Sequence, residues 1–204
     1  MKYLFIDSTY DLSLGILDDG LNWLSFETHS GQKASAIIQA KTFSMLDSFK
    51  IKSHELSGVI AIHGPGFYTG LRLSEGFADV FDYFGIKKYS FYSYEIPQWC
   101  GFSKGCWFTK AYRGEYFFFR WDSTISRQEM VQVKDLESAI GSEQFFIHSK
   151  SSLDSISSPL IQNPLETTEL LKTHPEKIFS EVLKDQRREP FYFRAPEDEF
   201  KVNP

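Results

Sequence analysis

The chain is poor in the residues that carry most catalytic and metal chemistry. Its 204 residues include five histidines and only two cysteines, Cys100 and Cys106. The cysteines lack the C-x-x-C spacing of a redox or zinc site, and no histidine pair has a short metal-binding spacing. We therefore expect no metal site, and we interpret both cysteines as small core residues of a protein in the reducing cytoplasm.

Long apolar runs and an excess of positive charge are also missing. The apolar run Tyr3–Ile6 ends at Asp7, which argues against a secretory signal, and no run is long enough to span a membrane. Lys and Arg number 22 against 27 Asp and Glu, a formal net charge of −5. A broad basic surface for nucleic acid is therefore not expected, and no membrane partner is expected either.

Aromatic residues, in contrast, are abundant: the chain has 20 Phe, 10 Tyr and 4 Trp. Together with 42% hydrophobic and 24% charged residues, this composition predicts a globular protein with a large buried area. The run Phe117-Phe118-Phe119 is typical of a strand that is buried on both faces.

The apolar pattern of the first half predicts an α/β unit. Helices are expected over 32–50 and 70–84, where apolar residues recur at helical spacing. The order strand, strand, strand, helix, strand, helix, strand combines an antiparallel meander with parallel crossovers. The strands are expected at residues 2–6, 12–17, 23–27, 58–62 and 88–91.

A second, less regular copy of this unit follows, so we divide the chain into a first lobe, 1–97, and a reduced second lobe, 98–204. Strands are expected at 106–110, 116–121, 129–133 and 145–148. Short helices are expected near 135–140, 165–171 and 176–184, with an extended tail from residue 187.

A glycine-rich loop, Gly64-Pro65-Gly66-Phe67-Tyr68-Thr69-Gly70, joins an expected strand to an expected helix, where backbone N–H groups can hold an anion. However, Leu71-Arg72 stands where a Walker loop requires Lys-Ser/Thr, and the third glycine comes one residue late for a dinucleotide fingerprint. Pro65 also lacks an N–H donor. The spacing alone therefore favours a stiff turn with Thr69 as the helix N-cap.

Two further positions suggest chemistry. Asp7 lies at the carboxyl end of the first expected strand, where open α/β sheets bind ligands, although an Asp before Ser and Thr more often caps a turn. Gly101–Gly105 spells the G-x-S-x-G of a nucleophile elbow around Ser103, but a strand is expected after it where that motif needs a helix. A serine hydrolase or protease is therefore the weakest functional alternative.

Residues Gly64–Arg72 resemble the G-P-G-S-F-T-G-L-R signature of the TsaB (YeaZ) family. Further similarities follow in family order: Ile6–Thr9 resembles its I-D-T/S start, His29-Ser30 its H-S pair, and Ala111, Gly114 and Glu115 its D-A-R-x-G-E pattern. Residues Pro190–Arg194 resemble its P-x-Y-L-R tail. The chain departs from the family pattern at four positions: Phe67, Ser74, Lys110 and Tyr112.

The resemblance implies the actin-like ATPase superfold (ASKHA, ribonuclease H-like), which is built from a duplicated βββαβα unit. It implies a role in making threonylcarbamoyladenosine in tRNA, as the non-catalytic partner of the transferase TsaD, with TsaE completing the bacterial complex and tRNA contacted indirectly. Since this chain lacks the H-x-x-x-H metal motif of TsaD, it fits the partner better than the transferase. The family implies no resident cofactor, with ATP or ADP at the TsaD interface as the alternative.

The two long helices carry more apolar surface than one sheet face needs. We expect them to dock against the matching helices of TsaD, and isolated chains to form homodimers through the same surface. The expected interface residues are Ile37, Ile38, Met45, Arg72, Phe77 and Val80. The main rival is a nucleotide-dependent ATPase or phosphotransferase, whose phosphates would be held by Asp7, Gly64, Pro65, Gly66, Thr69 and Gly70.

Overall fold

The first sheet has the strands and helices that the sequence predicts. The computed structural model describes residues 1–111, 114–139, 144–150, 163–184 and 187–193. Its first five strands are β1 (Tyr3–Asp7), β2 (Leu12–Leu17), β3 (Trp23–His29), β4 (Gly58–Ile62) and β5 (Lys88–Phe91). The sheet order is β3-β2-β1-β4-β5, with β1, β2 and β3 antiparallel and β1, β4 and β5 parallel.

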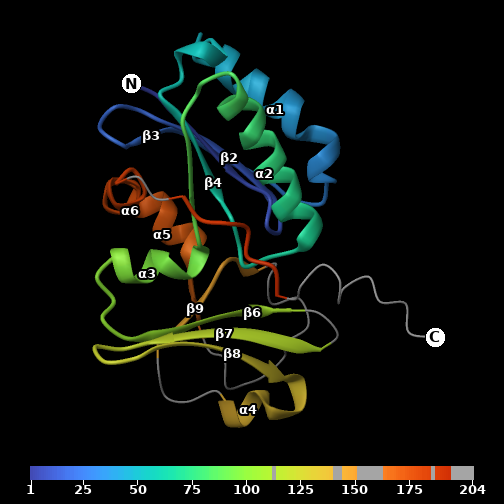
Figure 1. Cartoon of the computed structure of the whole chain (residues 1–204), viewed down its shortest axis with the longest axis vertical. Helices are drawn as coiled ribbons and strands as arrows, with labels where there is room; N and C mark the ends of the chain where they lie inside the picture. Colours follow the sequence, from blue (N-terminus) through green and yellow to red (C-terminus); the bar gives the residue numbers. More distant parts are fainter. Residues whose placement is uncertain (112–113, 140–143, 151–162, 185–186, 194–204) are drawn as a thin grey trace, which may run out of the picture.

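Helices α1 (Ala34–Ser48) and α2 (Tyr68–Tyr83) provide the two crossovers and cover one face of this sheet (Figure 1). Their buried side chains share one apolar cluster with alternate residues of the strands, such as Leu4, Ile6 and Val59. A 3-10 turn, η1 (Ser53–Glu55), follows α1, while η2 (Ser93–Glu95) and the short α3 (Ile96–Trp99) follow β5. The predicted helices 32–50 and 70–84 are thus confirmed with slightly different ends.

The second sheet repeats the first. Its strands are β6 (Gly105–Lys110), β7 (Glu115–Trp121), β8 (Ser126–Gln132), β9 (Phe145–Ile147) and β10 (Leu165–Glu166). The order β10-β9-β6-β7-β8 is the order of the first sheet when the five strands of each unit are matched in sequence. The parallel pairs β6–β9 and β9–β10 correspond to β1–β4 and β4–β5. The matching orders confirm the predicted duplication.

The second copy is reduced and differs most from the sequence-based expectation at its third strand and at β10. Among the described residues between β8 and β9, the helical elements are η3 (Val133–Asp135) and the four-residue α4 (Leu136–Ala139), compared with fifteen residues in α1. The third strand spans 126–132, where 129–133 was expected. The expected helix at 165–171 begins as β10, which pairs with Phe146 and Ile147, and only then continues as α5 (Thr167–Thr173). Local periodicity misses β10 because a two-residue strand depends on its distant partner.

Helices from the second half of the chain cover the other face of the first sheet. In α6 (Pro175–Val182), Ile178, Phe179 and Val182 are fully buried against strand residues that include Phe5 and Ile60. The three helices α3, α5 and α6 therefore lie between the two sheets (Figure 1). Residues beyond 98 thus complete the core of the first sheet.

The abundant aromatic residues fill the space between the sheets. Tyr94 stacks on Phe119 with a ring-centroid distance of 4.2 Å, in a cluster that also contains Trp107, Phe117, Trp121 and Phe146. Phe118 lies on the opposite face of β7 and stacks on Phe108. The prediction that 117–119 is buried on both faces is confirmed.

The other composition-based expectations have simple structural counterparts. Cys106 is buried in β6, and Cys100 is half-buried after α3; both are free thiols. Across the described residues, every helix is too short or too polar to cross a membrane.

Candidate functional site

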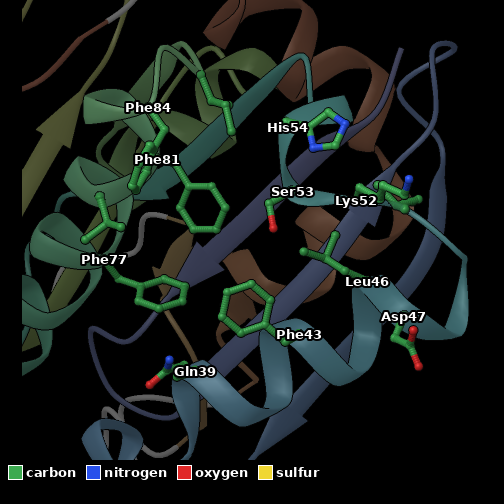
Figure 2. A pocket seen from close by; sticks show the side chains of 13 residues that line it. Gln39, Phe43, Leu46, Asp47, Lys52, Ser53, His54, Phe77, Phe81 and Phe84 are labelled. Atoms are coloured by element: carbon green, nitrogen blue, oxygen red, sulfur yellow. The ribbon is translucent and has the colours of Figure 1, made fainter.

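The outer surface of the first unit contains an apolar groove between α1 and α2, with a volume of about 1080 Å³ (Figure 2). Both helices and the segments that follow them supply its apolar lining: Phe43, Leu46, Ile51, Phe77, Val80, Phe81, Phe84 and Ile86. Phe43, Val80 and Phe84 are exposed by 45%, 53% and 73%, respectively. Exposed apolar surface of this kind is typical of a protein interface.

The structure corrects part of the expected interface. Ile38 and Met45 face the sheet and are only 3% and 5% exposed, so neither is available to a partner. Their seven-residue spacing places them on one side of α1, which is the side that packs on β-strands. Ile37 and Phe77 are partly buried against the same core, whereas Val80 is exposed as expected.

The exposed aromatic residue Phe43 was not among the expected interface residues. The signal that could have identified Phe43 is its position directly after Thr42, which is four residues after Ile38 and three before Met45 and so shares their side of the helix. A residue one position further is rotated by about 100° around the helix and therefore faces away from that side.

The polar side of α2 makes several contacts with other parts of the chain. Arg72 lies over the rings of Tyr68 and Tyr192, at 5.1 and 5.9 Å from their centroids. Two turns further along, Asp79 pairs with Lys88, and Asp82 Oδ2 accepts a hydrogen bond from Arg187 at 2.8 Å. Lys88 and the tail segment 187–193 thus contact this side, where Arg72 and Asp79 remain exposed, and the groove lies along the apolar side of α2.

The glycine loop packs tightly against the end of β1. A Cβ atom on Gly70 would lie 1.8 Å from the backbone oxygen of Ser8, and one on Gly66 would lie 2.6 Å from Thr9 Cβ. Ser8 Oγ donates to the Gly70 oxygen at 2.7 Å, and the Phe67 N–H donates to the Thr9 oxygen at 3.0 Å. Close approach of two backbone segments therefore explains these glycines.

The expected helix cap is corrected by the structure. Phe67 is the N-cap residue of α2, without a side-chain hydrogen bond, and Thr69 lies inside the helix. Thr69 is exposed and does not cap the helix. The close contacts of Gly66 and Gly70 with Ser8 and Thr9 hold the loop in place instead.

The tail completes the same junction. Gly64 has a φ of +106°, and its oxygen accepts a hydrogen bond from the Ser93 N–H at 2.9 Å. The Phe191 N–H donates to the His63 oxygen at 2.8 Å, next to Pro65. Segments 6–9, 64–72 and 190–193, which carry most of the family resemblance, therefore meet at one place in the fold.

The other family-like positions lie elsewhere. Ala111 and Gly114 lie in the connection between β6 and β7, and Glu115 begins β7; the Ala111 N–H donates to the Glu115 oxygen at 2.8 Å. Lys110 ends β6. Tyr112 and Arg194 lie outside the described residues.

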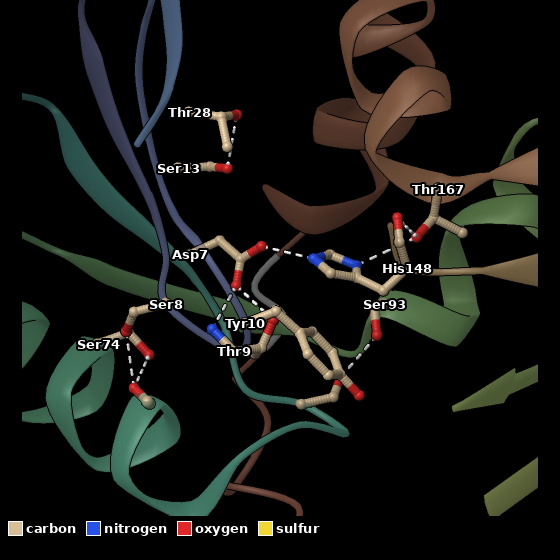
Figure 3. Close-up of polar contacts among 12 residues, drawn as sticks. Asp7, Ser8, Thr9, Tyr10, Ser13, Thr28, Ser74, Ser93, His148 and Thr167 are labelled. Atoms are coloured by element: carbon tan, nitrogen blue, oxygen red, sulfur yellow. Dashed lines mark hydrogen bonds and ion pairs between the residues drawn. The ribbon is translucent and has the colours of Figure 1, made fainter. Parts of the chain in front are cut away.

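Asp7 ends β1 in a buried polar cluster (Figure 3). Its Oδ1 accepts hydrogen bonds from the Thr9 N–H at 2.8 Å and the Thr9 hydroxyl at 2.6 Å. Its Oδ2 lies 2.7 Å from His148 Nε2. The turn cap that the sequence favours for Asp7 is present, and both carboxylate oxygens already have partners within the chain.

A polar cavity of about 550 Å³ adjoins this cluster. Its cationic groups are paired with carboxylates: Lys150 Nζ lies 3.6 Å from Glu166, and Lys172 Nζ lies 2.7 Å from Glu169. These cations are therefore partly neutralised before any phosphate could reach them.

Ser103 has no elbow geometry. It is exposed in a turn that leads directly into β6 at Gly105, so the helix required after a nucleophile elbow is replaced by a strand. The nearest histidine in chain order after it, His148, is paired with Asp7.

His63 is the buried titratable group of the junction. Its Nδ1 lies 2.7 Å from the Arg188 oxygen, and it is 1% exposed. Burial lowers the pKa of His63 from 6.5 to about 4, which outweighs the opposing effect of the hydrogen bond to Arg188. The ring is therefore neutral at physiological pH.

Comparison with solved structures identifies the architecture. No protein-family model and no curated protein matches the chain. A crystal structure described as an uncharacterized protein with similarity to peptidase YEAZ from Pseudomonas aeruginosa matches 95% of this chain and 99% of its own, with a TM-score of 0.64 and 13% identity. YeaZ from Pseudomonas aeruginosa matches 94% of this chain and 99% of its own, with a TM-score of 0.63 and 12% identity. The chain has a YeaZ-like fold.

At 12–13% identity this likeness shows the fold alone. It extends over both units, and the predicted duplicated βββαβα plan with a reduced second copy is confirmed by the matching strand orders of the two sheets.

Proposed function

We propose that this chain is a non-catalytic subunit of the machinery that forms threonylcarbamoyladenosine in tRNA, and that it binds a TsaD protein through the groove between α1 and α2. TsaE joins the same complex, and TsaD provides most of the contact with tRNA. The open apolar groove is the observation that carries this proposal. The YeaZ-like fold and the TsaB-like sequence marks support it.

The arrangement of α2 supports this choice of surface. Val80 and Phe84 are exposed apolar residues on the groove side of α2, whereas charged residues of its polar side pair within the chain, Asp79 with Lys88 and Asp82 with Arg187. Burying side chains of this size contributes about 1.5–3 kcal/mol each. A few such residues are enough to dominate the energy of an interface.

The groups that a catalytic role would need are engaged within the chain. Both oxygens of Asp7 accept contacts from Thr9 and His148, and the loop glycines are in contact with Ser8 and Thr9. This arrangement favours a binding subunit over a phosphotransferase.

The proposal is tested by co-expressing the chain with TsaD from the same genome. We expect a stable complex by size-exclusion chromatography, and restored threonylcarbamoyladenosine, measured by nucleoside mass spectrometry, in cells depleted of their own TsaB. Val80→Asp should weaken the complex at least about tenfold, because it removes apolar contact and buries a charge. Ile125→Asp is the matched control, since Ile125 is 57% exposed and lies far from the groove in the β7–β8 turn.

A wild-type chain that neither binds TsaD nor restores the modified nucleoside would overturn the proposal. Equal loss of binding by Val80→Asp and Ile125→Asp would place the interface outside the groove.

The alternative function is a nucleotide-dependent phosphotransferase, which the polar cavity beside Asp7 favours. It predicts that the isolated chain binds Mg-ATP in calorimetry and that Asp7→Ala abolishes this binding. The binding-subunit proposal predicts no such signal from the isolated chain.

A further inference from the structure

The two sheets are joined at the carboxyl ends of two strands by a buried pair of side chains. Asp7 is the last residue of β1 in the first sheet, and His148 directly follows β9 in the second. Asp7 Oδ2 and His148 Nε2 are 2.7 Å apart, and the two side chains are only 2% and 3% exposed. Two residues separated by 141 positions thus share a nearly buried site, which forms part of the wall of the polar cavity of about 550 Å³.

Asp7 and His148 are each oriented by a threonine of their own unit (Figure 3). Thr9 fixes the Asp7 carboxylate through two hydrogen bonds to Oδ1, which leaves Oδ2 directed at His148. On the other side, His148 Nδ1 lies 3.2 Å from the hydroxyl of Thr167 at the start of α5. Neither side chain can rotate away without losing these contacts.

Tyr10 adds a second connection across the cleft. Its ring stacks on His148 at a centroid distance of 5.7 Å, and its hydroxyl is hydrogen-bonded to Thr109 of β6. The exposed ring of Phe67, from the glycine loop, packs on the outer side of Tyr10. The pair is therefore enclosed by residues of both units.

The internal duplication provides a comparison within the chain. His63 follows β4 as His148 follows β9, so the two histidines occupy corresponding positions. His63 bonds the Arg188 oxygen of the tail, whereas His148 meets a carboxylate of the opposite sheet. A buried histidine at this strand end is thus common to both units, but the contact across the cleft belongs to His148.

Ligands of open α/β sheets usually bind outside the carboxyl ends of the strands, and a buried carboxylate there needs a cationic or hydrogen-bonding partner. In this chain a side chain of the second sheet supplies that partner. We propose that Asp7 and His148 form an intramolecular latch that holds the carboxyl ends of β1 and β9 together, beside the polar cavity, without a bound ligand.

The latch acts only at one end of the contact between the sheets. The aromatic cluster around Tyr94 and Trp107 and the packing of α6 hold the remainder. Removing the latch should therefore open the region around Thr9 and Tyr10 while the fold persists, because such local openings cost less than global unfolding.

Hydrogen exchange measured by mass spectrometry on the full chain tests this idea. In His148→Ala, peptides covering 8–12 and 144–150 should exchange at least about tenfold faster, because the substitution leaves the buried Asp7 carboxylate without its partner. Added imidazole should restore protection by filling the cavity beside Asp7, and it should fail to do so in the Asp7→Asn/His148→Ala double variant. His63→Ala is the matched control and should loosen the tail at 187–193 while the 8–12 peptide stays protected.

Three results would overturn the latch. The first is unchanged exchange at 8–12 in His148→Ala, and the second is imidazole rescue that does not require Asp7. The third is protection of 8–12 in the wild-type chain only when Mg-ATP is added, because the contact would then depend on a ligand. If His148→Ala does not fold, urea midpoints of Asp7→Asn, His148→Gln and the double variant decide: non-additive losses support the latch, and additive losses refute it.

Discussion

The contact between Gly70 and Ser8 leads to an unusually sharp prediction, because a second glycine in the same helix has the opposite environment. A Cβ on Gly70 would lie 1.8 Å from the Ser8 backbone oxygen, roughly 1.5 Å short of ordinary van der Waals contact. The position of a Cβ is fixed by the backbone and the Ser8 oxygen is a main-chain atom, so neither can rotate aside. Gly76, two turns further along α2, has no atom within 4 Å of its Cβ position.

The expected effects have opposite signs. Gly70→Ala has to push α2 away from the end of β1, which costs about 1–3 kcal/mol in strain. The same movement stretches the hydrogen bond from Ser8 Oγ to the Gly70 oxygen, at about 1 kcal/mol more. For a protein of this size these losses should lower the Tm by roughly 10 °C. Gly76→Ala should instead raise stability by about 0.5–1 kcal/mol, because alanine is the better helix former at an exposed position.

Thermal unfolding followed by circular dichroism, with urea titrations on both variants, measures these effects. Helix propensity alone predicts that both substitutions stabilise the chain, whereas the close contact with Ser8 predicts that Gly70→Ala destabilises it. The sign of the Gly70→Ala effect therefore distinguishes these two explanations. An unchanged or higher Tm for Gly70→Ala would refute the close-contact explanation of the glycine loop.

Three further predictions concern stability. The pKa of His63 is about 4 in the folded chain and 6.5 in the unfolded chain, so the unfolded chain takes up the proton first as the pH falls. The free energy of unfolding should therefore decrease by about 3 kcal/mol between pH 6.5 and pH 4. Urea unfolding across this range should show a flatter pH dependence for His63→Asn, and identical slopes would contradict the assignment. Phe179→Ala should lower the free energy of unfolding, measured in urea, by about 3–5 kcal/mol because Phe179 is fully buried. Phe84→Ala, at a position that is 73% exposed, should change the same free energy by less than about 0.5 kcal/mol. A double-mutant cycle on Arg187 and Asp82, both partly exposed, should give a coupling below about 1 kcal/mol; a larger value would mean that the tail is clamped more firmly than a surface ion pair allows.

The chain combines an open apolar groove on the first unit with the buried Asp7–His148 contact between the two units. Val80 and Phe84 leave apolar surface open on the outside of the first unit, while Asp7 and His148 hold the carboxyl ends of β1 and β9 together. A partner bound at α1 and α2 would therefore meet a scaffold whose inter-sheet contact does not depend on a small ligand.

The sequence by itself determined most of the secondary structure and the duplicated plan. The strands at 12–17, 58–62 and 88–91 were predicted with their observed ends, because apolar β-formers bounded by turn residues act locally. The glycine loop was also recognisable, although its purpose was not: the clash that excludes a Cβ at Gly70 exists only because Ser8 lies against it.

Only the tertiary structure decided which side chains are available and which are paired. Ile38 and Phe43 are both apolar residues of α1, yet one is buried and the other exposed, since the sheet covers a single side of the helix. β10 exists because β9 is beside it, and Asp7 finds His148 across 141 residues. Local propensity determines the helices and strands of this chain. Long-range packing determines which apolar residues remain exposed in the groove, and long-range pairing joins Asp7 to His148.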